Sequence, residues 1–521
     1  MFRTLLRKEL HANLLSPRLR VPAVCGVAIA VGATLLGTLD FARNMRVYER
    51  EAASVERALE EATVYSQVQH RVVVPPQAPA IFSRGIAGTA GQGIQIRVDS
   101  VPISSWKLEE GYDSDLLMPL ARIDFAAVVA VIFSLMAVLL GHDGLCGERQ
   151  SGTLRLLLAN PVERREVVRA KLAGGMISLS IPLAAAFALC LLVLLVHPAV
   201  RLSGEDGARL GLFLALSCLF LAQVHALSLM VSSLVRRTET ALVICLFAWL
   251  AAGVGYGHHL LPSLGRYLVK APPAEEYRYQ DGGLWGNLRR EVRKWEEENP
   301  SPGQAWLEAW SSGGALRYGH PLGYEWRQRK HAFEMEKRLE RAELSSRYHW
   351  ANWERLSTMA SIADLGAIAL PATNYQLLSS ILARTTQYDR FYLTETGREY
   401  REALIEYLRG RGGLAGRRWF TDDTEDQVPM IADPASATEA MLAAGSPFMR
   451  ERLAWVMEQE ESLPPGERRL DLTDMPRFEG PPARALGYSL ALMIPGLLVL
   501  TLGLAVPVWI TTRRFGRGHP K

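Results

Sequence analysis

Few residues in this chain have the type and spacing that chemistry requires. His258 and His259 are adjacent where an apolar run ends, and two imidazoles could bind a metal ion. No carboxylate or cysteine lies near them in the sequence, so we favour an interfacial role over a metal site. Gln223 and His225 lie within another apolar run, where polar side chains need partners or water. They could line a substrate path, but we favour hydrogen bonding between helices.

The sequence contains none of the local motifs that mark common active sites. It has no G-x-x-x-x-G-K-[ST] phosphate loop, no H-E-x-x-H zinc signature, no C-x-x-C pair and no G-x-S-x-G nucleophile elbow. We therefore expect no catalytic residue, no metal site and no cofactor in this chain. If ATP and Mg drive its function, a separate subunit must bind them.

The segment 143–171 carries charged residues between two long apolar runs, and its pattern predicts a compact knob. Glu148 precedes Gly152 and Thr153, which can open a short helix, and Asn160-Pro161 would end it. The apolar surface of that helix would come from Leu154, Leu156, Leu157 and Leu158. A second, basic helix is expected to begin near Glu163. Such a knob could take up motion from a soluble partner.

This pattern resembles the first cytoplasmic loop of the ABC-2 class of ABC transporter permeases. That loop carries an acidic residue, a Gly-Thr pair, a leucine run, a proline and then basic residues. The matching residues here are Glu148, Gly152, Thr153, Leu156 to Leu158, Pro161, Arg164 and Lys171. In that family the loop docks on the ATP-hydrolysing subunit. The resemblance therefore implies an ATPase-coupling role for Glu148, Gly152, Thr153, Leu156, Leu157, Pro161 and Arg164.

Two further segments are similar to the same family. The first, 1–20, has Leu5, Leu6, Leu10 and Leu14 near helical spacing and resembles the family's amphipathic first helix on the cytoplasmic side. The second begins at Pro371 and resembles a segment found in the branch that has an enlarged extracytoplasmic domain before the last spanning helix. The resemblance also implies two ATP-binding subunits and a second permease, either the same chain or a related one.

Apolar runs set the fold class. Of the 521 residues 49% are hydrophobic, and they gather into six runs long enough to cross a bilayer. The predicted transmembrane helices are 21–40, 121–142, 172–197, 208–235, 238–257 and 485–510. The first run lacks a convincing cleavage site, so we expect it to be retained. Pro182, Pro495 and Pro507 fall within these runs and could act as hinges or as static kinks.

Charge predicts the orientation. Arginine and lysine gather in 1–20, in the loop 143–171, at Arg236 and Arg237, and in the tail 511–521. Since an excess of these residues in short loops marks the cytoplasmic side, both termini should be cytoplasmic, in the inner membrane of a prokaryote. The segments 41–120 and 258–484 should then be extracytoplasmic. The net charge of +4 is small for this length and does not suggest nucleic acid.

The two long segments differ in character. Segment 41–120 is predicted to form a helical stalk over Arg43 to Gln69 and a strand at Ile94, Ile96 and Val98, giving a small α+β domain. Segment 258–484 has a candidate helix from Tyr324 to about Leu370. Its aromatic residues are Trp326, Phe333, Tyr348, Trp350 and Trp353. They could form a ligand-binding face, but we favour the buried stripe of a mainly α domain. All five cysteines lie outside both segments, so neither can contain a disulfide.

Together these observations predict a polytopic α-helical membrane protein with six transmembrane helices, a small α+β domain and a larger mainly α extracytoplasmic domain. The expected function is that of a permease subunit in an ATP-driven exporter of an unidentified substrate, such as a peptide or an amphiphile. Its expected partners are the ATPase subunits, a second permease and membrane lipid. Alternatively, the chain transmits force to an envelope partner without moving a substrate through the membrane.

Overall fold

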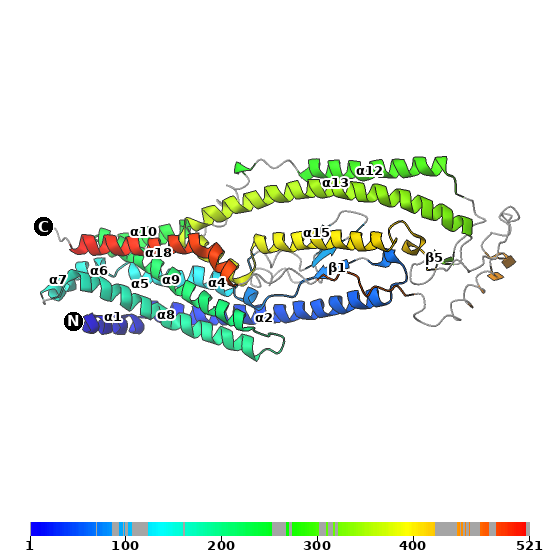
Figure 1. Ribbon diagram of the computed structural model, residues 1–521. Coiled ribbons are helices and arrows are strands. Elements are labelled where there is room, and N and C mark those ends of the chain that lie inside the picture. Colours follow the sequence, from blue (N-terminus) through cyan, green and yellow to red (C-terminus); the bar gives the residue numbers. More distant parts are fainter. Residues whose placement is uncertain are drawn as a thin grey trace.

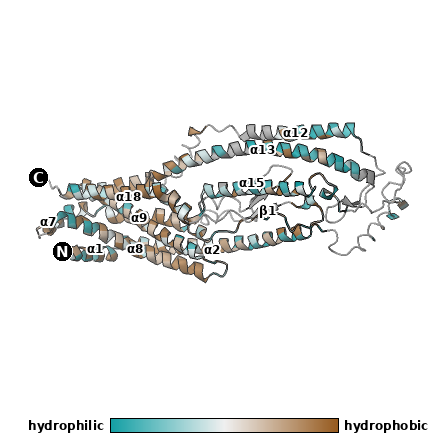
Figure 2. Ribbon diagram, in the orientation of Figure 1, coloured by the Kyte–Doolittle hydropathy of each residue, from teal (hydrophilic) through white to brown (hydrophobic). Residues whose placement is uncertain are grey.

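The molecule is elongated, with a bundle of helices at one end and a domain that projects from it (Figure 1). This computed structural model describes residues 2–68, 70–85, 93–96, 98, 103–106, 123–159, 162–252, 267–269, 274–301, 309–310, 316–317, 321–422, 445–448, 450–451, 454, 458, 469–478 and 486–516. The bundle is mainly apolar and the projecting domain mainly polar (Figure 2). Helix α1 (Phe2–Leu15) and the C-terminal end of α18 (Leu486–Gly516) lie together at the far end of the bundle.

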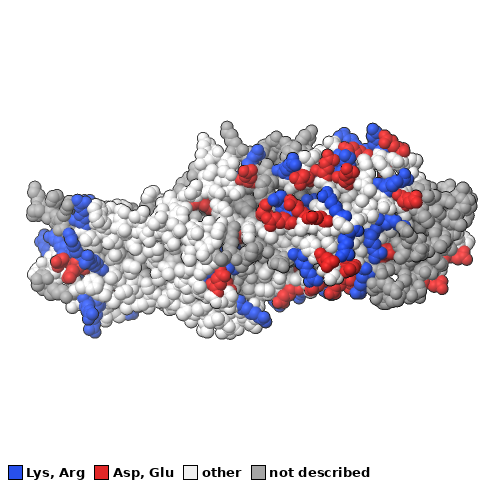
Figure 3. Space-filling model, in the orientation of Figure 1, with Lys and Arg blue, Asp and Glu red and all other residues white. Residues whose placement is uncertain are grey.

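Long apolar helices build the bundle. In the part of the chain that the structure describes, five helical stretches are long and apolar enough to cross a membrane: Pro17–Glu60 (α2), Phe125–Gln150, Arg164–Val196 (α8), Gly204–Leu234 (α9) and Leu486–Phe515. A sixth apolar helix, α10 (Thr238–Leu250), is shorter, and 253–257 of the predicted span lie outside the described residues. Each predicted run thus coincides with an apolar helix. On the face shown in Figure 3, charged side chains are sparse along the middle of the bundle and gather toward its free end and over the projecting domain.

The second stretch is less regular than the others. It begins with α4 (Phe125–Val128), which Asp124 caps by accepting a hydrogen bond from the Ala127 amide. A π-helical turn (Val129–Phe133) and α5 (Ser134–Gly141) follow. By contrast, α8 and α18 continue through Pro182, Pro495 and Pro507, so these prolines do not end a helix.

Aromatic rings fill the bundle where it meets the projecting domain. Phe82, Phe125, Phe187 and Phe213 form a cluster with ring centroids 5.1 to 6.0 Å apart. Three of these residues lie on α4, α8 and α9, but Phe82 directly follows the short helix η2 (Ala78–Ile81). The segment after the first spanning helix therefore supplies part of the bundle core.

Helix α14 (Pro371–Ala383) also belongs to the bundle core, although it lies in the segment predicted to form the large outer domain. The Tyr375 ring stacks on Phe220 of α9 with centroids 4.6 Å apart. The Asn374 amide donates a 2.9 Å hydrogen bond to the backbone carbonyl of Gly496, on α18. The segment 258–484 therefore contributes a helix, α14, to the core of the bundle.

The projecting domain begins on α2, whose 44 residues make one continuous helix about 66 Å long. The predicted stalk is confirmed, but it ends at Glu60 and not at Gln69. Next in the chain comes an antiparallel sheet in the order β1 (His70–Val73), β2 (Gly93–Ile96) and β3 (Ile103–Trp106). The predicted strand is confirmed over β2.

Among the residues that the structure describes, the rest of this domain includes α12 (Ala274–Glu298), the strands β4 (Ala309–Trp310) and β5 (Leu316–Arg317), α13 (Pro321–Ile368), α15 (Gln387–Gly410) and the short helix η6 (Arg417–Trp419). Helix α13 confirms the predicted long helix. Trp326 and Phe333 on α13 pack against Trp295 of α12, with centroids 6.0 and 5.8 Å from its ring, and all three residues are partly buried. The side chains of Tyr348, Trp350 and Trp353 lie outside the described residues.

Candidate functional site

The predicted knob is present at the free end of the bundle. After α5 the chain turns at 142–145 and forms α6 (Cys146–Gln150) and α7 (Thr153–Leu158), which we call the knob. Gly152 joins the two helices with φ of 77°, a left-handed conformation that costs other residues about 1–2 kcal/mol. Helix α8 then begins at Arg164, next to the predicted Glu163. Pro161, which was predicted to end the short helix, lies outside the described residues.

The leucines of α7 divide between two sides. Leu154 is buried, and it packs with Val167, Leu229 and Phe515 from α8, α9 and α18. Leu157 and Leu158 are partly buried against the same cluster. Leu156 is 72% exposed. The short helix is thus held by three leucines and presents the fourth on its outer surface.

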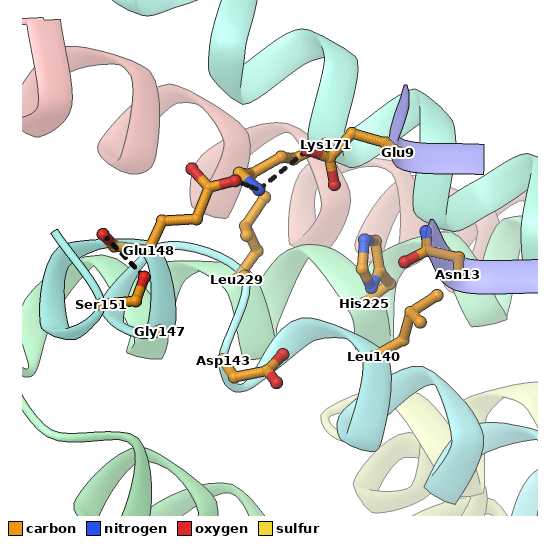
Figure 4. Close-up of a pocket in the computed structure, with 11 residues that line it drawn as sticks. Glu9, Asn13, Leu140, Asp143, Gly147, Glu148, Ser151, Lys171, His225 and Leu229 are labelled. Atoms are coloured by element: carbon orange, nitrogen blue, oxygen red, sulfur yellow. Dashed lines mark hydrogen bonds and ion pairs between the residues drawn. The ribbon is translucent and has the colours of Figure 1, made fainter. Parts of the chain in front are cut away.

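We expected Glu148 to face outward, because the resemblance implied that it contacts a partner. In the structure its side chain faces into the bundle. Its Oε1 lies 2.8 Å from Nζ of Lys171 and 3.3 Å from Nζ of Lys8. Lys171 is only 7% exposed and also contacts Glu9 Oε1 at 3.1 Å (Figure 4). A lysine buried to this extent needs opposite charges close by, and the two glutamates supply them. Glu148 therefore fixes the knob to α1 and α8.

Thr153 and Arg164, two other predicted residues of the loop, also make hydrogen bonds within the chain. Thr153 donates through its hydroxyl to the Glu148 carbonyl at 3.3 Å, which links α7 to α6. Arg164 donates to the Phe515 carbonyl at 3.3 Å and so links the start of α8 to the end of α18. These contacts give the Gly-Thr pair and the basic residue structural roles.

Several residues that hold the knob were not identified from the sequence. Arg18 pairs with Asp143 at 2.7 Å. The Ser232 hydroxyl accepts hydrogen bonds from the amides of Leu145 and Cys146 at 3.0 and 3.1 Å. One signal was available, because Lys171 opens an apolar run and a cation there requires an acidic partner. The choice of Glu9 among the acidic residues depends on tertiary packing.

A polar cavity of about 360 Å³ lies behind the knob, between α1, α5, α6, α8 and α9. Figure 4 shows its lining, which includes Glu9, Asp143, Glu148, Lys171 and His225. His225 is 2% exposed, and its Nδ1 lies 3.4 Å from the Ala137 carbonyl of α5. The imidazole also packs closely on Gly175 of α8, since a Cβ there would lie 2.1 Å from Nε2.

Gln223 lies on the same helix but contacts a different neighbour. It is 4% exposed, and a Cβ on Gly503 of α18 would lie 1.9 Å from its Nε2. Glycines on α8 and α18 thus make room for the two polar side chains of α9. This arrangement is the one expected for contact between helices.

A metal ion in a protein needs several side chains placed around it. In the part of the chain that the structure describes, no group of three or more His, Cys, Asp or Glu side chains is placed to hold an ion. His258 and His259 lie outside the described residues. The prediction about them stays untested.

Comparisons with known proteins agree with this architecture. The family model described as "ABC-2 family transporter protein" matches residues 3–394, about three quarters of the chain. A protein of Pseudomonas aeruginosa named "Probable ABC transporter permease protein NosY" is 32% identical over 213 residues. That match covers 38% of this chain and 70% of the Pseudomonas protein.

Proposed function

This chain belongs to the ABC-2 family of transporter proteins, and from that membership we propose that it is the permease subunit of an ATP-driven exporter. Permeases of this family have no ATPase site of their own, so two separate subunits would bind ATP and Mg. A second permease, identical or related, would complete the membrane part. The substrate we propose is an amphiphile or a peptide, because a large projecting domain suits a bulky cargo better than a small ion.

The proposed topology has six spanning helices, with both termini and the knob in the cytoplasm of a prokaryote. The segments 41–120 and 258–484 would then project from the outer face of the inner membrane as a small α+β and a larger mainly α domain. Clustering of Arg and Lys at the free end of the bundle supports this orientation. Gln223 and His225 would lie at membrane depth as contacts between helices.

The observation that carries the proposal is how the knob is mounted. Buried leucines and the ion pairs of Lys171 hold α6 and α7 on α1, α8, α9 and α18. Leu156 remains on the outer surface, where an ATPase could bury it. A push on this knob would therefore move several spanning helices together and would not simply bend a loop.

Replacing Leu156 by Asp tests the docking. The carboxylate would be buried without a partner at the contact, which costs several kcal/mol, so the ATPase should no longer co-purify. Leu156→Met keeps the apolar surface and is the matched control. Leu154→Asp puts the same charge in the buried cluster and should unfold the knob, which separates docking from stability. If Leu156→Asp still co-purifies with a fully active ATPase, the knob is not the coupling element.

The alternative function is force transmission to an envelope partner, and one observation favours it. Helix α2 runs unbroken from the bundle into the projecting domain. Helix α13 joins the projecting domain to α14 in the bundle core. Such continuous helices could carry movement outward without a transported substrate. In reconstituted vesicles an exporter should show ATPase stimulation by its substrate. A force transmitter should respond only to its partner protein.

A further inference from the structure

Arg209 is a buried arginine at the projecting-domain end of α9. It is 1% exposed, and its guanidinium binds three helices. Within α9 it bonds Glu205 Oε1 through Nε at 3.0 Å and Nη2 at 2.7 Å. Through Nη1 it donates to the Leu382 carbonyl of α14 at 3.2 Å and to the Ser489 hydroxyl of α18 at 3.0 Å. One side chain thus joins two spanning helices to α14.

Arg384 completes this network from the corner between α14 and α15. Its Nη2 lies 2.6 Å from the same Glu205 Oε1, and its Nη1 donates to Gln77 Oε1 at 3.1 Å. Glu205 therefore accepts from both arginines. Gln77 directly precedes η2, so the network also reaches the segment that follows the first spanning helix.

The backbone of Arg384 shows that this position is unusual. With φ of 57° it is the one non-glycine residue with positive φ in the described part of the chain. Helices that end in this conformation commonly have glycine there, since other residues pay about 1–2 kcal/mol. An arginine at a site that favours glycine accepts this cost, and its side chain makes contacts that glycine could not make.

A second set of contacts holds the same corner from the opposite side. The Thr385 hydroxyl donates to the Ser83 carbonyl at 3.1 Å. Gly85 has φ of 47°, and a Cβ there would lie 2.6 Å from the Thr385 carbonyl oxygen. Arg84, which lies between Ser83 and Gly85 in the chain, pairs with Asp40 of α2 at 3.3 Å. The corner is thus fixed to α2 as well as to α9 and α18.

We propose that Glu205, Arg209 and Arg384 form a clamp that makes the projecting domain follow movements of α9 and α18, with Arg209 as the positioning residue. The inference rests on the proposed function, in which an ATPase moves those helices. Helix α14 packs in the bundle and α15 in the projecting domain, so the corner 384–386 is the joint between them. Without the clamp, Thr385 still contacts Ser83 and Gly85, but the joint loses the bonds that tie Arg384 to Glu205 of α9. With the clamp, α15 is held at a fixed position relative to the bundle.

The experiment uses the full chain in lipid nanodiscs with its ATPase, in a background without native cysteines. Spin labels at Arg201, in the loop before α9, and Glu399, on α15, report the distance between bundle and domain; both side chains are exposed. In the parent protein we expect a narrow distance distribution that shifts on trapping with ATP, Mg and vanadate. In Arg209→Met and Arg384→Gly the distribution should broaden and the shift should disappear. Hydrogen exchange at the 384–386 amides should become about 10- to 100-fold faster.

Arg384→Gly separates the clamp from an ordinary helix end. Glycine relieves the backbone conformation, so if Arg384 only ended the helix, exchange at the corner would stay the same or become slower. That result, with the distance shift retained, overturns the proposal. If Arg209→Met fails to fold, Arg384→Gly and Glu205→Gln still decide the question. The control is Arg398→Met, on a partly buried arginine of α15 that pairs with Glu395 and Glu402 of the same helix, and it should change neither measurement.

The two proposals fail in distinguishable ways. If no ATPase binds the chain, the proposed function is wrong, yet exchange at 384–386 in the chain alone still tests the clamp. If the ATPase binds and traps normally but the distance shift survives in Arg209→Met and Arg384→Gly, the clamp is wrong and the permease assignment stands. ATPase activity itself should remain in both variants, because neither arginine lies near the knob.

Discussion

Lys171 holds the knob in place, and replacing it should loosen the knob from the bundle. Its ammonium lies 2.8 Å from Glu148 Oε1 and 3.1 Å from Glu9 Oε1. At an effective dielectric constant of about 20, each of these attractions is about 5 kcal/mol before desolvation is subtracted. Removing one partner of a buried ion pair costs about 3–5 kcal/mol. Because the two glutamates keep 16% and 14% exposure, we expect the lower end, about 3 kcal/mol, for Lys171→Met.

A second variant tests whether this loss is electrostatic. In Lys171→Met the two carboxylates share Lys8, at 3.3 Å from Glu148 and 3.7 Å from Glu9, and the added change Glu148→Gln removes one of these two negative charges. This double variant should recover about 1–2 kcal/mol relative to Lys171→Met. Glu148→Lys goes the other way, since it places a third cation beside Lys8 and Lys171. Because Glu148 faces inward, we expect this charge reversal to loosen the knob itself and not only to weaken docking.

Thermal unfolding of the purified chain, with hydrogen exchange at the amides of α6, measures both effects. Lys337→Met is the matched control, since Lys337 pairs with Glu340 at 3.4 Å on an accessible surface and should contribute less than about 0.5 kcal/mol. The reasoning is refuted if Lys171→Met unfolds at the parent temperature with unchanged exchange in α6. Equal losses in the single and double variants would refute the electrostatic explanation, and would leave packing of the lysine stem as the cause.

Three further predictions concern packing, topology and covalent structure. Gly175→Ala should destabilise the bundle by about 1–3 kcal/mol, because its Cβ meets the confined ring of His225. Gly503→Ala should destabilise the bundle less, because the flexible Gln223 amide can move. Gly32→Ala is the control: a Cβ there has no atom within 4 Å, so thermal unfolding should not change. Cysteine substitutions of Trp106 and Trp353 should react with an impermeant reagent added from outside, and one of Arg514 only from inside; inside labelling at 353 would contradict the six-helix topology. Because the segments 41–120 and 258–484 contain no cysteine, a reductant should leave the thermal stability of the projecting domain unchanged, and a large drop would mean that its boundaries are wrong.

The elements that depend on local pattern could be predicted, and the contacts that depend on tertiary packing could not. Apolar runs predicted the places of the apolar helices in the described bundle, and Gly152 with Thr153 predicted the start of α7. The direction of Glu148 could not be read from the loop, because its partners Lys8 and Lys171 come from two other helices. The packing of α14 in the bundle could not be read from the sequence either. Its core position depends on Tyr375 and Asn374, whose partners lie more than a hundred residues away.

The position of α14 has a consequence for how this protein is made. The buried face of α14 packs between α9 and α18. The bundle therefore lacks part of its interior until α14 has been synthesised and has packed there. In chain order α14 follows α12 and α13 and precedes α18. The membrane bundle must therefore remain incomplete while most of the projecting domain is synthesised, and it closes only when α18 arrives. A chain from which 258–484 had been deleted would lose Tyr375 and Leu378 from its core and would leave a hole beside Phe220. The helix α14 thus belongs to the bundle in its packing, and a deletion of the projecting domain that includes α14 would also remove part of the bundle core.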